Sequence, residues 1–118
     1  RHSVAEVLCR ADEPVIVKQV ANAFRDTDLK KRLDDNNIGE VVVVGAMSHM
    51  CIDAAARAAK DFGYAVTVIH DACATRDLEF DGVKVAAAQV HAAFMAALAS
   101  SYASVVSTEA HLAAAAAA

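Results

Sequence analysis

Four consecutive valines at residues 41–44 constrain the fold of this chain more than any other feature. The run is too short to form a helix by itself and too apolar for an exposed edge. It therefore predicts a central strand of a parallel sheet, buried on both faces. Gly45 lets the chain turn sharply after the strand. Ser48 then predicts the N-cap of a following helix.

Cys51 falls in the first turn of that predicted helix. The unpaired N–H groups and the positive end of the helix dipole favour a thiolate there, and the thiolate is the form of cysteine that attacks carbonyl carbons. The same N–H groups can bind the oxyanion that such an attack creates. The segment therefore predicts a nucleophile. The alternative is a small core residue, because free cysteines are among the most often buried side chains.

Composition limits the classes of protein to which the chain can belong. With 118 residues and 57% hydrophobic content, it is at most one globular domain. The net charge of −4 comes from scattered residues without a basic stripe, which argues against a nucleic-acid partner. No apolar run approaches the ~20 residues needed to span a bilayer, so we expect no membrane association. Three cysteines without CxxC spacing indicate free thiols and a reducing, cytoplasmic location.

Strand-like and helical patterns alternate along the chain. This alternation predicts an α/β fold in which helices cover both faces of a parallel sheet. A polar loop is expected over residues 71–82. The predicted strands are residues 15–18, 41–45, 65–70 and 104–107, and further helices are predicted over residues 28–36, with Thr27 as a candidate cap, and 85–101.

Three segments with reactive or polar side chains follow predicted strands. Lys18 ends the first strand, the turn at residues 45–51 follows the second, and residues 71–77 follow the third. Ligands of open α/β sheets bind at the carboxyl ends of strands. We therefore expect these three segments to share one crevice.

In order and spacing, these residues resemble the isochorismatase-like cysteine hydrolases, the family that includes nicotinamidase and N-carbamoylsarcosine amidase. The match runs from Glu13 to about Glu109. The segments that carry it are residues 13–18 (EPVIVK), 22–24 (NAF), 27–29 (TDL), 41–51, 57–59 (RAA), 63–64 (GY), 71–75 (DACAT) and 90–91 (VH).

The resemblance implies a Rossmann-like three-layer fold with a six-stranded parallel sheet in the order 3-2-1-4-5-6. It also implies a Cys-Lys-Asp triad, with Cys51 as the nucleophile and Lys18 as the lysine. An ammonium group facing the thiol would favour the thiolate and could relay its proton. The family further carries a cis peptide bond, here Ala46-Met47, which turns the Met47 N–H toward that of Cys51 to form an oxyanion hole.

Members that cleave a vinyl ether have glycine where Cys51 stands, so the resemblance favours the amidase-type branch. The implied reaction is hydrolysis of a C–N bond, amide or ureido, in a small molecule through a thioester. The alternative is a non-catalytic member that serves as a binding or oligomerisation module. We expect no cofactor and a homo-oligomer, either a dimer or a tetramer.

The triad aspartate has no counterpart in this sequence, because in the family it ends the first strand. Residues 1–112 are therefore expected to be the C-terminal portion of one hydrolase domain that lacks its N-terminal strands. Residues 15–18 should then lie about two strand spacings, ~10 Å, from residues 41–45. The alanine run at residues 113–118 resembles an unassigned or artefactual tail, and it is left out of the functional reasoning.

Four further residues have two interpretations each. His49 could line the pocket or contact a neighbouring subunit, or it could be an ordinary surface histidine. Phe24 could be a pocket wall or a core residue, and Cys73 could be a redox partner of Cys51 or a buried spectator. His91 is expected to be packed or hydrogen-bonded rather than catalytic. The predicted substrate contacts are Phe24, Ala46 and His49; no metal site is expected, because the histidines lack metal-ligand spacing.

Overall fold

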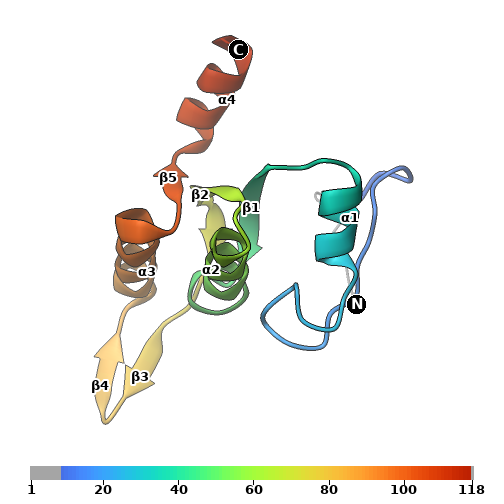
Figure 1. Cartoon of the computed structure of the whole chain (residues 1–118). Helices are drawn as coiled ribbons and strands as arrows, with labels where there is room; N and C mark the ends of the chain where they lie inside the picture. The colour runs from blue at the N-terminus through green and yellow to red at the C-terminus, as the bar shows by residue number, and fades with distance from the viewer. Residues whose placement is uncertain (1–8, 118) are drawn as a thin grey trace.

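A three-stranded parallel sheet organises the fold (Figure 1). The computed structural model describes residues 9–117. The sheet contains β1 (Glu40–Ala46), β2 (Ala65–Ala74) and β5 (Ser104–Val106) in the order β1-β2-β5. This matches the last three strands of the predicted order 3-2-1-4-5-6, and the predicted α/β class is confirmed.

Helices connect the parallel strands, as a crossover between such strands requires. The helical elements are α1 (Leu29–Asp35), the single π-helical turn η2 (Ser48–Ile52), α2 (Asp53–Asp61), α3 (Ala87–Ser101) and α4 (Thr108–Ala117). Residues 113–117 of the alanine run continue α4, whereas Ala118 lies outside the described residues. None of the helices in the described part of the chain has the length and apolar character of a membrane span.

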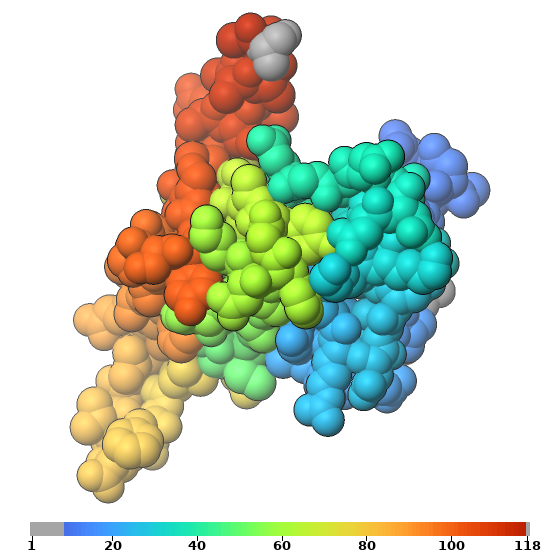
Figure 2. Space-filling model, in the orientation of Figure 1, coloured from blue at the N-terminus to red at the C-terminus, as the bar shows by residue number. Residues whose placement is uncertain are grey.

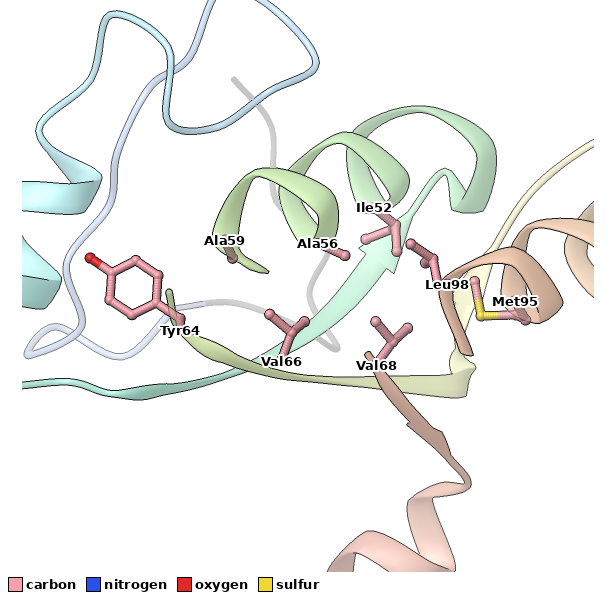
Figure 3. Close-up of a cluster of buried hydrophobic side chains, with 8 residues drawn as sticks. All are labelled: Ile52, Ala56, Ala59, Tyr64, Val66, Val68, Met95 and Leu98. Carbon is pink, nitrogen blue, oxygen red and sulfur yellow. The ribbon is translucent and has the colours of Figure 1, made fainter. Parts of the chain in front are cut away.

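The core lies between one face of the sheet and the helices α2 and α3 (Figure 3). Small residues of α2 allow its backbone to approach β2 closely, and Val68 of β2 and Leu98 of α3 are completely buried. The core cluster is Ile52, Ala56, Ala59, Tyr64, Val66, Val68, Met95 and Leu98. Ile52, which follows Cys51 in the chain, belongs to this cluster. The turn that carries Cys51 is therefore attached directly to the core.

The prediction that β1 is buried on both faces is wrong for the described residues. Burial alternates along β1, and the side chains of Val42 and Val44 are 50% and 54% exposed. Val41 and Val43 instead pack against the core cluster. Successive side chains of a strand point to opposite faces, so an uncovered second face exposes every other valine.

The strand predicted over residues 15–18 is not formed. These residues join no ladder in the described part of the chain, and Val15 and Val17 are 44% and 58% exposed. A strand requires a neighbour for its N–H and C=O groups, and β1 hydrogen-bonds to β2 alone among the described strands. The expected ~10 Å gap remains a prediction.

The polar loop predicted over residues 71–82 is also wrong in part. The strand β2 continues to Ala74, and β3 (Leu78–Phe80) pairs antiparallel with β4 (Val83–Val85). Asp81 and Gly82, which connect them, both have positive φ values, of 51° and 76°. An Asp-Gly pair between apolar residues is a hairpin signal that the sequence analysis overlooked. The hairpin projects from the body of the molecule (Figures 1 and 2).

The helix predicted over residues 28–36 is confirmed as α1. The N-cap position is Asp28 rather than the predicted Thr27, and its side chain makes no capping hydrogen bond; Thr27, one residue earlier, accepts a hydrogen bond from the N–H of Leu29 through its hydroxyl oxygen, at 3.3 Å. Asn37 follows the helix with a φ of 56°, the left-handed conformation that commonly ends helices.

Asp71 ties β2 to the start of α4. One of its carboxylate oxygens accepts hydrogen bonds from the Thr108 hydroxyl at 2.7 Å and from the Thr108 N–H at 2.8 Å. These two donors lower the pKa of Asp71, the hydroxyl more than the N–H. The tie therefore stabilises the fold fully above the ordinary aspartate pKa of about 4 and is lost as the pH falls through the lower folded value.

We therefore expect Thr108→Val to raise the pKa of Asp71 toward its ordinary value, because the substitution removes the stronger donor. Carboxyl-carbon NMR titration of Asp71 measures this directly. In urea unfolding, the wild-type protein should be more stable than the Thr108→Val variant at pH 6, and this difference should shrink toward pH 3. Identical titration curves for both proteins would contradict the assignment.

Candidate active site

Lys18 and Cys51, which lie 33 residues apart in the sequence, meet at the carboxyl end of β1. The Lys18 Nζ lies 3.1 Å from the Cys51 Sγ, and it also donates a hydrogen bond to the Val20 carbonyl at 3.0 Å. Lys18 is exposed and Cys51 is half-buried. A cation within hydrogen-bonding distance of a partly accessible thiol is the environment in which cysteines are reactive.

The segment that carries Cys51, which we call the thiol turn, is η2 (Ser48–Ile52). It is a π-helical turn that leads into α2 rather than the first turn of an α-helix. The Met47 carbonyl accepts hydrogen bonds from the N–H groups of Met50 at 3.0 Å and Ile52 at 3.3 Å, which close the turn around Cys51. Single π turns occur often at functional sites.

The chain enters the thiol turn through an unusual backbone path. Gly45 has a φ of 125°, a conformation that residues with a side chain rarely adopt. The Ala46-Met47 peptide bond is cis, as the sequence analysis predicted. Ala46 itself is exposed at the end of β1, and Met47 is half-buried.

Ser48 does not have the predicted N-cap role. No side chain caps η2, and Ser48 is completely buried with its hydroxyl directed elsewhere. Its Oγ lies 2.7 Å from the Nδ1 of His91 in α3 and 3.4 Å from the Ala74 carbonyl oxygen. The cap prediction failed because a tertiary partner competes with the local N–H groups for the hydroxyl. The expectation that His91 is hydrogen-bonded is confirmed.

His49 is tied to its neighbours rather than free at the surface. Its Nδ1 lies 2.7 Å from the Thr75 hydroxyl, and its ring meets that of Phe94 edge-on with centroids 6.0 Å apart. Thr75 comes directly after β2, so the thiol turn and the end of β2 do share one edge of the sheet, as predicted.

Phe24 lies in an apolar groove along β1. Its ring centroid is 5.3 Å from that of Phe62 and 6.3 Å from that of Tyr64. The groove has a volume of about 320 Å³, and neither Cys51 nor Lys18 is among the residues that line it. The packing favours the core interpretation of Phe24, and its predicted contact with substrate remains a prediction.

Cys73 differs chemically from Cys51. Its Sγ donates a hydrogen bond to the Ile69 carbonyl at 3.3 Å, and burial raises the pKa of its thiol, an effect that the N–H of Gly45 partly offsets. The three cysteines are free, with Cys9 exposed. These features favour the interpretation of Cys73 as a spectator thiol.

The triad carboxylate that the family resemblance implies is not found in the described part of the chain. No carboxylate among residues 9–117 pairs with Lys18, whose ammonium contacts the Val20 carbonyl and the Cys51 thiol. Nor do the described His, Cys, Asp and Glu side chains form a cluster of three that could hold a metal ion.

Comparison with known proteins identifies the family. The isochorismatase domain matches residues 3–110 of the chain. The chain belongs to the isochorismatase family. An uncharacterized isochorismatase family protein of Bacillus subtilis, YddQ, is 51% identical over 100 residues, which cover 85% of this chain and 56% of that protein. The chain thus spans about half the length of this relative.

Other family members include hydrolases. A streptothricin hydrolase of Streptomyces noursei is 41% identical over 66 residues, covering 56% of this chain and 24% of that enzyme. The solved structure of an isochorismatase from Pseudomonas putida KT2440 superposes with a TM-score of 0.90 at 37% identity, covering 92% of this chain and 56% of that one. These likenesses confirm the fold and the predicted family.

The environments of the cysteines predict selective alkylation. In a Cys9→Ser background at pH 7.5, we expect iodoacetamide to modify Cys51 faster than Cys73, because burial raises the pKa of the Cys73 thiol whereas Cys51 lies beside the Lys18 ammonium. Peptide mass spectrometry over time measures both rates. Equal rates, or faster labelling of Cys73, would contradict the assignment.

Proposed function

We propose that the chain belongs to a cysteine-dependent hydrolase that cleaves an amide or ureido C–N bond of a small molecule through a thioester. The contact of 3.1 Å between the Lys18 Nζ and the Cys51 Sγ carries this proposal. The family, which includes a named hydrolase relative, supports the general class of reaction. The choice of bond rests on the presence of a thiol at position 51.

The chemistry follows from the two side chains. Lys18 stabilises the thiolate of Cys51 by charge, and the thiolate attacks the carbonyl carbon. The tetrahedral intermediate collapses with cleavage of the C–N bond, and the Lys18 ammonium supplies a proton to the leaving nitrogen. Water then attacks the thioester and gives a proton to the neutral Lys18 amine, which releases the carboxylic or carbamic acid and restores the Lys18 ammonium and the Cys51 thiolate.

The backbone N–H groups of Met47 and Cys51 are the proposed donors to the oxyanion of the tetrahedral intermediate. Two donors about 3 Å from one oxygen would stabilise the charge as it develops. Ala46 precedes Met47 in the sequence, and His49 lies between Met47 and Cys51. Both are proposed to contact the substrate. Phe24 remains a proposed wall of the pocket.

A non-catalytic binding module is the second candidate. The observation that favours it is the lack of a carboxylate partner for Lys18 among residues 9–117. A lysine without a carboxylate to accept its proton could hold a ligand without turning it over. Detection of a covalent acyl adduct on Cys51 would favour the hydrolase over the binding module.

We expect Cys51→Ala to reduce hydrolysis to below a few per cent while the melting temperature stays within a few degrees, because the thiol's proposed role is chemical. Ammonia release from a panel of primary amides and ureido compounds measures turnover by the full chain, and intact mass detects the acyl-Cys51 intermediate. Cys73→Ala is the matched control and should keep its activity. Substantial turnover by a folded Cys51→Ala protein would remove Cys51 from the role of nucleophile.

We expect Lys18→Met to slow both turnover and alkylation of Cys51, because it removes the cation beside the thiol. Acid–base groups of this kind contribute about 10²- to 10⁴-fold to turnover. Lys60→Met is the control, since Lys60 is an exposed lysine of α2. Wild-type rates in the Lys18→Met protein would show that the contact has no chemical role.

A further inference from the structure

The thiol turn is anchored by contacts that the proposed reaction does not use. Ser48, its first residue, is completely buried, and its Oγ lies 2.7 Å from the Nδ1 of His91. The same oxygen lies 3.4 Å from the carbonyl oxygen of Ala74, the last residue of β2. Buried hydroxyls require partners, and both partners here come from elements other than the thiol turn.

The next residue of the turn is held by the same two elements. His49 contacts the Thr75 hydroxyl just after β2 and the ring of Phe94 in α3. His91 and Phe94 are three residues apart, and so they lie on the same face of α3. Two consecutive residues of the thiol turn are therefore held between the end of β2 and one face of α3.

We propose that Ser48 and His91 are positioning residues, whose hydrogen bond holds the thiol turn so that the Cys51 thiol stays beside Lys18. This inference rests on the proposed function. Cys51 is only three residues beyond Ser48, whereas its cationic partner lies on an exposed segment outside the sheet. The position of the thiol relative to the ammonium must therefore be fixed by the thiol turn.

The hydrogen-bonding capacity of the pair defines one arrangement that satisfies both contacts. The Ser48 hydroxyl has a single proton to donate. When the Nδ1 of His91 carries a proton, it donates to the Ser48 Oγ, and the hydroxyl is free to donate to the Ala74 carbonyl. In the other tautomer, the hydroxyl must choose between its two acceptors. A His91 ring that carries a proton on Nδ1 therefore satisfies both contacts of the Ser48 hydroxyl.

Ser48→Ala tests the proposal. We expect kcat to fall by about 100-fold with little change in KM, because misplacing a reacting group by about 1 Å costs a factor of this order and Ser48 is buried away from substrate. Alkylation of Cys51 by iodoacetamide should also slow. Ser100→Ala is the matched control, since its hydroxyl, also in a helix, donates only to the Ala97 carbonyl.

A pair of variants at His91 keeps the test decisive if Ser48→Ala fails to fold. Asn can place a hydrogen-bonding group near the position of Nδ1, whereas Leu cannot. We expect His91→Asn to recover most of the Cys51 alkylation rate that His91→Leu loses. Equal rates in the two His91 variants, or wild-type alkylation and kcat in a folded Ser48→Ala protein, would overturn the proposal. Alkylation requires no turnover, so this result is independent of whether the chain hydrolyses any amide.

Discussion

The parallel pairing of β1 with β2 is the constraint on which the rest of the site depends. The ladder is regular up to Val43, which faces Val68, and it then skips so that Gly45 faces Cys73 and Ala46 faces Ala74. The excess residues of β2 form an irregularity that brings its last residues level with the end of β1. Without this skip, neither Ala74 nor Thr75 would lie beside the thiol turn. The same irregular stretch holds Asp71, which reaches across to α4.

One side of the thiol turn is buried, and the other side presents the reactive thiol. On one side, Ser48 and Ile52 are buried against α3 and the core. On the other side, Cys51 is partly accessible and Met50 is 49% exposed. A turn anchored at its first and last residues can present a thiol to solvent and still keep a fixed backbone. The packed core thus supplies rigidity to a group that must itself stay accessible.

The main elements could be predicted because their signals are local. The valine run and the helix over residues 28–36 each depend on a few neighbouring residues, and so does the position of Cys51 just beyond β1. Apart from the β3–β4 hairpin, whose Asp-Gly signal is local, the failures come from non-local effects. The hydroxyl of Ser48 bonds to His91, 43 residues away, and residues 15–18 have strand character without a strand to pair with. The strand-end rule predicted that Lys18 and Cys51 share one crevice, whereas their direct pairing was anticipated only through the family resemblance, since no local pattern encodes it.

The distance in sequence between Lys18 and Cys51 also makes their contact a reporter of the native state. No secondary-structure element contains both residues, and only tertiary packing brings them together. Lys18 lies on a segment whose backbone joins no sheet, and such segments open at a lower free energy than the core. Local opening there would separate the ammonium from the thiol while β2, α2 and α3 remain packed. The reactivity of Cys51 therefore reports whether this segment stays in place, in addition to how firmly the thiol turn is anchored.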